Sequence, residues 1–130
     1  MDWTVEFGRG PADVTVKTSG DATVLGFETL NRELATDERF AARSTVLVDN
    51  SELDYSALST NDMERIARSA NLLGKEVAGL FVAILAPPGL AYGRTRQFEA
   101  FASQSPQQFM TFTDRGEALE WLRQVKLLRD

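Results

Sequence analysis

A short apolar run that ends in an aspartate constrains this chain more than any other sequence feature. The run is Val46-Leu47-Val48-Asp49, and it is followed by a polar loop and by an amphipathic segment that begins near Ser59. Its apolar residues do not alternate with polar ones, which is typical of a strand covered on both faces. In α/β proteins, ligands usually bind at the carboxyl ends of such strands. The run therefore predicts a central strand over 45–49 and the position of a binding site.

The spacing of apolar residues along the rest of the chain predicts eight further elements. Alternating residues and apolar runs predict strands over 3–7, 14–17, 77–86 and 109–112. Apolar residues three and four apart predict helices over 24–34, 63–73, 91–102 and 118–125, with Gly74 in the left-handed position that ends the second helix. We therefore expect one α/β domain over residues 1–130, with a single mixed β-sheet of about five strands. Its helices pack mainly on one face, and its order is ββαβαβαβα.

The absence of both cysteine and histidine excludes many catalytic mechanisms. No disulfide, thiolate nucleophile, Ser-His-Asp triad or Cys/His zinc site can form, and we expect neither a cofactor nor a metal. Fourteen basic against nineteen acidic residues give a net charge of −5, which opposes binding to nucleic acid and to anionic membranes. The N-terminal residues lack the pattern of a signal peptide, and the apolar run over 77–88 is shorter than the ~20 residues of a membrane span. A cytoplasmic protein without a membrane span is expected.

Four segments carry a resemblance to a known family. They are the run over 46–49, the apolar segment over 79–87, the motif Tyr92-Gly93-Arg94-Thr95-Arg96-Gln97-Phe98, and the C-terminal segment over 112–122 with its closing Glu117-Ala118-Leu119-Glu120-Trp121-Leu122. Together they resemble the SpoIIAA-like family of the STAS superfold. The resemblance implies a single domain with a mixed sheet, in a group whose members are largely uncharacterised, and it implies no activity. A similarity at the level of fold to the lipid-binding CRAL-TRIO domains comes with it.

Regulators of the STAS superfold suggest a role for Ser59. Those regulators bind a kinase or a sigma-factor antagonist, and they are switched by phosphorylation of a serine in an Asp-Ser-Ser-Gly motif. An ungapped comparison places residues 57–60 of this chain against the motif, and Ser59 alone matches. Ser59 is therefore either a phosphoacceptor at a helix N-terminus or an N-cap that accepts an amide hydrogen bond. The N-cap is favoured because serine is among the commonest capping residues.

The other candidate site residues lie at the ends of the two predicted central strands. Asp49 and Ser51 either present a carboxylate and a hydroxyl to a ligand or hydrogen-bond within their own loop. Tyr92, Arg94 and Arg96 suggest a clamp for a carboxylate or phosphate near a helix N-terminus. The alternative is that an arginine pairs with a carboxylate such as Asp49. Since the arginines are two residues apart, at most one can face inward.

Two further sets of residues have both a functional and a structural interpretation. Phe98, Phe101 and Trp121 line an apolar cargo pocket or, as is usual for aromatic residues at helical spacing, belong to the core. Three aspartates offer oxygen ligands for a divalent cation, but their spacing lacks the glycine and bidentate glutamate of a calcium loop. These aspartates are Asp49, Asp54 and Asp62.

The sequence favours a noncatalytic binding or regulatory domain that contacts a protein partner or a small anionic ligand at the strand ends. One alternative is a carrier of a lipid-like or other apolar small molecule, as the CRAL-TRIO similarity suggests. The other is a His-free enzyme that uses Asp49, Tyr92 and Arg94 for proton transfer and anion stabilisation. A homodimer through a sheet edge or the C-terminal helix is a further expectation.

Overall fold

The computed structural model describes residues 1–8, 10–73 and 77–129, excluding the side chains of residues 72 and 73. The predicted α/β order ββαβαβαβα is confirmed. The elements are β1 (Asp2–Phe7), β2 (Val14–Asp21), α1 (Val24–Thr36), β3 (Thr45–Asp54), α2 (Thr60–Leu73), β4 (Phe81–Leu85), α3 (Leu90–Phe101), β5 (Gln108–Phe112) and α4 (Arg115–Arg129). None of the described helices has the length and apolar character needed to cross a membrane.

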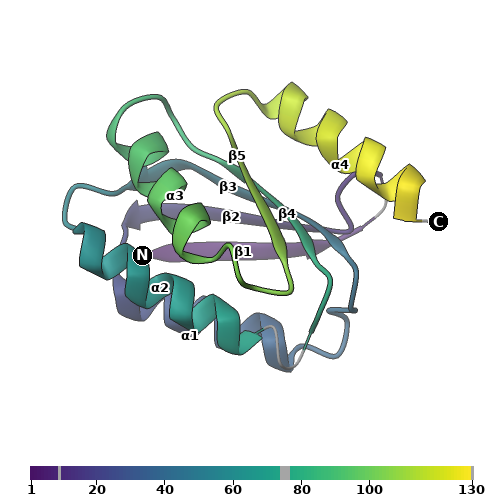
Figure 1. Ribbon diagram of the computed structural model, residues 1–130, viewed down its shortest axis with the longest axis horizontal. Helices are drawn as coiled ribbons and strands as arrows, with labels where there is room; N and C mark the ends of the chain where they lie inside the picture. The colour runs from purple at the N-terminus through teal and green to yellow at the C-terminus, as the bar shows by residue number, and fades with distance from the viewer. Residues whose placement is uncertain (9, 74–76, 130) are drawn as a thin grey trace.

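The five strands form one mixed sheet in the order β1-β2-β3-β4-β5, as Figure 1 shows. β1 runs antiparallel to β2, and the pairs β2/β3, β3/β4 and β4/β5 are parallel. Because β2 to β5 point the same way, their carboxyl ends lie at one edge of the sheet and their amino ends at the opposite edge. We refer to these as the carboxyl edge and the amino edge.

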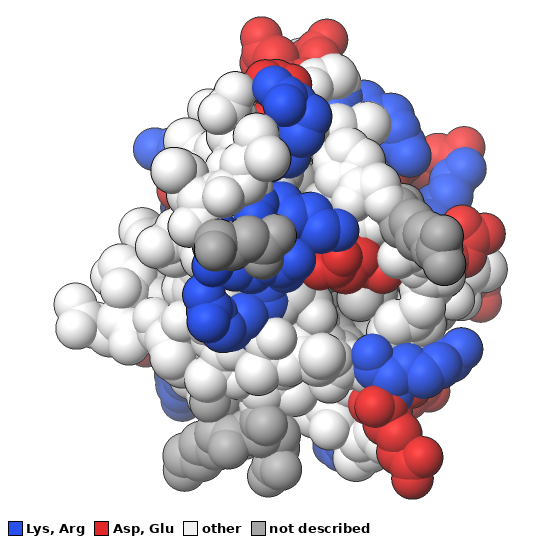
Figure 2. Space-filling model, turned by 90° about the vertical axis from the view of Figure 1, so that its right-hand side faces the viewer, with Lys and Arg blue, Asp and Glu red and all other residues white. Residues whose placement is uncertain are grey.

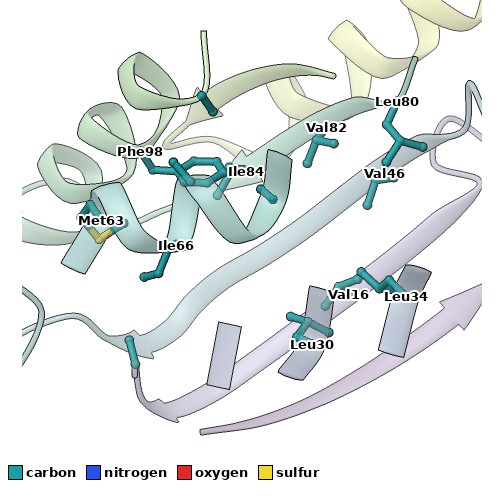
Figure 3. Close-up of a cluster of buried hydrophobic side chains, with 14 of the residues drawn as sticks. Val16, Leu30, Leu34, Val46, Met63, Ile66, Leu80, Val82, Ile84 and Phe98 are labelled. Carbon is teal, nitrogen blue, oxygen red and sulfur yellow. The ribbon is translucent and has the colours of Figure 1, made fainter. Parts of the chain in front are cut away.

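The two faces of the sheet have separate apolar cores. Three helices, α1, α2 and α3, cover one face, where Val46, Val82 and Ile84 point into the main cluster (Figure 3). The other face is covered by α4, whose Ala118 and Leu122 pack on strand residues of opposite orientation. This alternation follows from the strand period of two. The prediction that the helices pack mainly on one face is therefore confirmed.

Three predicted strand boundaries were wrong. β2 extends to Asp21, beyond the predicted range of 14–17. β3 extends to Asp54, beyond the predicted range of 45–49, and β4 begins at Phe81 rather than at residue 77. The segment before β4 is bound by a side chain instead of a strand. The Nε2 atom of Gln107 donates to the carbonyl of Val77 at 2.5 Å, and its Oε1 accepts from the amide of Leu80 at 2.7 Å. The predicted role of Gly74 falls outside the described residues.

Candidate functional site

Asp49 does not end its strand as predicted: it lies within β3, beside Leu85 at the carboxyl end of β4, with its side chain on the α4 face. The side chain is buried, and its Oδ1 accepts hydrogen bonds from the amide of Ser51 at 3.0 Å and from the Ser51 hydroxyl at 2.6 Å. Its Oδ2 pairs with Nη1 of Arg115 at 3.0 Å. Burial raises the pKa of Asp49, but the bonds from Ser51 and the charge of Arg115 outweigh it and lower the pKa. The carboxylate is therefore ionised and fully engaged by its own loop and by α4.

The interpretation that pairs Asp49 with an arginine of the third helix was wrong. Its partner is Arg115 of α4, whereas Arg94 lies on α3 and contacts the start of α2. Because side chains alternate along a strand, Asp49 shares the orientation of Leu47, which packs on α4. The candidate residues of β3 and those of α3 thus lie on opposite faces of the sheet.

Ser59 occupies the N-cap position of α2. Its hydroxyl accepts a hydrogen bond from the amide of Asp62 at 3.1 Å, and Oδ2 of Asp62 accepts from the amide of Ser59 at 2.9 Å. These reciprocal bonds form a capping box and lower the pKa of Asp62, the Ser59 amide contributing most. The geometry is that of the structural interpretation. Phosphorylation of this exposed residue stays a prediction.

Arg94 joins α3 to the beginning of α2. Its Nε donates to the carbonyl of Leu58 at 3.0 Å, and its Nη1 contacts Oε1 of Gln97 at 3.1 Å and Oγ1 of Thr60 at 3.4 Å. Arg96 is exposed and approaches Oε1 of Glu99 at 3.5 Å. As expected from their spacing, the two arginines face different ways. The inner one is held mainly by neutral groups of the protein.

Tyr92 and Leu90 form the outer surface of the first turns of α3. The Leu90 side chain is 50% exposed, and Tyr92 is half-buried. The Tyr92 hydroxyl has no hydrogen-bond partner among the described residues. The helix starts at Gly89, whose φ of 101° suits glycine, and it lacks a side-chain cap. Polar and apolar surface is thus presented together beside the capped start of α2.

A buried polar network on the main-core face was not found from the sequence. The Oγ1 of Thr18 donates to Oδ1 of Asn50 at 2.6 Å, and Nδ2 of Asn50 donates to the Tyr55 hydroxyl at 2.8 Å. The Tyr55 hydroxyl lies 3.4 Å from Oγ1 of Thr95, which itself donates to the carbonyl of Ala91 at 2.8 Å. Since the single hydroxyl proton of Thr95 is used there, Tyr55 is the donor toward Thr95. The network therefore satisfies each of its four side chains.

One signal of this network was present in the sequence. Val14 and Val16 point inward from β2, so Thr18 occupies the next inward position, and Asn50 follows Val46 and Val48 in the same way. A polar residue at an inward position needs a buried partner. The period of two therefore indicates both residues, whereas the distant partners Tyr55 and Thr95 depend on the tertiary fold.

A small cavity lies between the sheet and helices α1, α2 and α3. Its volume is about 80 Å³, its walls are mainly apolar, and Asn50, Tyr55 and Thr95 contribute polar groups. Phe98 lines it, but the predicted set of cargo-binding aromatics is divided. Phe101 is 39% exposed, and Trp121 packs on Phe112 at the α4 face, with ring centroids 5.8 Å apart.

The three aspartates considered as metal ligands do not converge. Asp49 pairs with Arg115, Asp54 accepts from the amide of Ser56 at 2.8 Å, and Asp62 caps α2. Within residues 1–8, 10–73 and 77–129, no three acidic side chains are grouped so that they could hold a metal ion. Each carboxylate has a local structural partner instead.

The fold and the strand-end site define a class: a single α/β domain with a mixed five-stranded sheet and its candidate site at the carboxyl edge. A search of solved structures matched the chain to an uncharacterised DUF3478-family protein from Shewanella loihica PV-4, whose fold is described as SpoIIAA-like. The match has a TM-score of 0.59 and 27% sequence identity, and it covers 92% of this chain and 93% of that one. Within the class, this chain has a SpoIIAA-like fold, and the predicted resemblance is confirmed. Neither a scan against protein-family models nor a search of curated proteins found a match.

Proposed function

We propose that this SpoIIAA-like domain is a noncatalytic binding module that contacts a protein partner through the first turns of α3 and the start of α2. The observation that carries the proposal is the exposed Leu90 in the first turn of α3, together with Tyr92 and the exposed Arg96, which are four residues apart and share one side of the same helix. Tyrosine and arginine are enriched among the residues that dominate binding energy at protein interfaces. The exposed Leu90 adds apolar area that a partner would bury.

The contacts of the candidate catalytic groups support a noncatalytic role. Asp49 is engaged by Ser51 and Arg115, and it lies across the sheet from Tyr92 and Arg94. A proton-transfer site requires its groups within hydrogen-bond reach of one substrate. Arg94 already donates to Leu58 and Gln97, which favours a protein partner over a small anion as the ligand of this surface.

Site-specific photo-crosslinking in the organism's own cells tests the proposal. A photoreactive amino acid at position 90 should give one discrete adduct, identified by mass spectrometry, and Arg96→Ala should abolish it. The matched control is the same amino acid at position 128, because Leu128 on α4 is also an exposed leucine, at 87%. The proposal fails if both positions give the same adducts or if position 90 gives none.

The small cavity supports a carrier as the second candidate function. It lies between the sheet and α3, where a carrier of an apolar molecule would hold its cargo. Its 80 Å³ is well below the roughly 300–1,000 Å³ of ordinary ligand pockets, so a carrier would have to open by separating helices from the sheet. Organic extraction of the protein from its own cells, followed by mass spectrometry, would detect a stoichiometric apolar cargo. Extraction of no such molecule would count against the carrier.

A further inference from the structure

A basic hollow lies at the amino edge, on the opposite side of the molecule from the proposed partner surface. It has a volume of about 570 Å³, and its charged lining among the described residues consists of Arg39, Arg43, Arg129 and one carboxylate, Asp13. Lys and Arg side chains gather around a recess on this side of the molecule (Figure 2). The lining has an excess of two positive charges in a chain whose net charge is −5. Such a local excess attracts anions despite the negative chain.

Asp13, the carboxylate among the described residues that line the hollow, is paired with cations of α4. Oδ1 of Asp13 pairs with Nζ of Lys126 at 2.5 Å, and its Oδ2 pairs with Nη1 of Arg129 at 3.1 Å. The amide of Thr45 also donates to Oδ2 at 3.0 Å. Asp13 therefore links α4 to the sheet, and its carboxylate pairs with Lys126 and Arg129 instead of with Arg39 or Arg43 of the α1–β3 loop.

Arg43 is held in an unusual backbone conformation at the rim of this hollow. Its φ of 65° lies in the left-handed region, which is uncommon for a residue other than glycine. Its Nη2 donates to the carbonyl of Arg129 at 3.2 Å, and no carboxylate pairs with its guanidinium among the described residues. Backbone strain of this kind is found at functional sites more often than elsewhere.

Arg39 is fixed in place by two neighbours. Its Nε and Nη2 bind the carboxylate of Asp37 at 3.1 and 2.8 Å, and its guanidinium lies over the ring of Phe7, 4.2 Å from the centroid. These contacts leave Nη1 as an available donor, and they reduce the side-chain entropy that a ligand would have to restrict. Arg39 and Arg43 thus offer donors to one space.

We propose that this amino-edge hollow binds a phosphate group through Arg39 and Arg43. A phosphate has three terminal oxygens and a double negative charge, so it can accept from both guanidinium groups at once, and guanidinium geometry matches it well. The hollow is also wide enough for the molecule that carries the phosphate. This site is independent of the proposed partner surface on α2 and α3.

The test is a titration of the amide spectrum of the ¹⁵N-labelled protein with inorganic phosphate, at constant ionic strength maintained with chloride. We expect saturable shifts of amides in residues 41–44. Arg43→Gly removes the guanidinium while suiting the φ of 65°, so it should preserve the stability to urea and weaken phosphate binding by about tenfold. Arg39→Ala should weaken binding similarly.

The matched control is Arg68→Ala, because Arg68 is as exposed as Arg39 and is likewise ion-paired, but lies on α2. It should leave phosphate binding unchanged. Non-saturating shifts, or equal affinity in the wild type and Arg43→Gly, would overturn the proposal. Sedimentation with phosphatidic acid vesicles distinguishes the source of the phosphate. Vesicle binding that Arg43→Gly abolishes identifies a lipid headgroup, and phosphate binding without vesicle binding identifies a soluble ligand.

Discussion

Replacement of Tyr55 by phenylalanine removes one hydroxyl from the buried polar network. Tyr55 is 3% exposed, and its hydroxyl accepts the hydrogen bond from Nδ2 of Asn50. Thr95 keeps its bond to the Ala91 carbonyl, so the main loss is the acceptor for Asn50. A buried donor left without an acceptor costs about 1–3 kcal/mol. For a domain of this size, each kcal/mol corresponds to roughly 3–5 °C in melting temperature.

Chemical denaturation in urea, with thermal melting as a second measure, tests this magnitude. Tyr92→Phe is the matched control, because its hydroxyl has no partner in the described part of the chain and its removal should change stability by less than about 0.5 kcal/mol. In an Asn50→Leu background, Tyr55→Phe should cost much less, with a coupling of about 1 kcal/mol. A neutral effect of Tyr55→Phe in the wild type would refute the dependence of Asn50 on the phenol.

The pH dependence of the same pair gives an independent check. Burial raises the pKa of Tyr55, and the hydrogen bond that its hydroxyl accepts from Asn50 only partly opposes this rise. Because the folded state holds this proton more tightly than the unfolded state, the contribution to stability is present below about pH 10 and is lost as pH rises above it. The stability difference between wild type and Tyr55→Phe should therefore shrink above pH 10. A difference that grows with pH would contradict the sign.

Three other perturbations test separate parts of the structure. Ser59→Ala should lower stability by about 1 kcal/mol and leave partner binding intact. The control Ser103→Ala, which removes an exposed hydroxyl without a hydrogen bond among the described residues, should change neither stability nor binding. Loss of binding at full stability in Ser59→Ala would instead favour a direct role of Ser59. Burial raises the pKa of Asp13, but bonds from Lys126, the Thr45 amide and Arg129 outweigh it and lower the pKa to about 2. Since this pKa is depressed in the folded state, Asp13→Asn should lower the free energy of unfolding by about 1–2 kcal/mol at pH 7. In acid denaturation this loss should become smaller between about pH 4 and pH 2. A loss that does not depend on pH would contradict the proposed pairing. Leu122→Ala should cost about 2–5 kcal/mol in urea, and a cost below 1 kcal/mol would contradict the packing of α4 on the second face.

The fold was predictable because its strands and helices have strong and different periods. Continuous apolar runs identified the central strands β3 and β4, and helical spacing identified the helices that cover them. The start of β4 was missed because residues 77–80 are apolar like a strand, but the side chain of Gln107 binds their backbone. That side chain comes from a segment 27 to 30 residues later, so no local pattern contains it.

The candidate site was predicted only in part, because side chains at one end of the strands can point to either face of the sheet. Asp49 lies within β3 and pairs with Leu85, the last residue of β4, whereas Arg94 lies on α3, the helix that follows β4. The environment of a strand residue depends on which face its side chain points to and on which helix covers that face. The first can be inferred from the sequence, since side chains alternate along a strand and Asp49 follows Leu47 by two residues. The covering helix is not visible, because α4 reaches that face from the far end of the sequence. The sheet therefore separates the Asp49 carboxylate from the α3 surface, so a partner bound there would meet Leu90, Tyr92 and Arg96 without it.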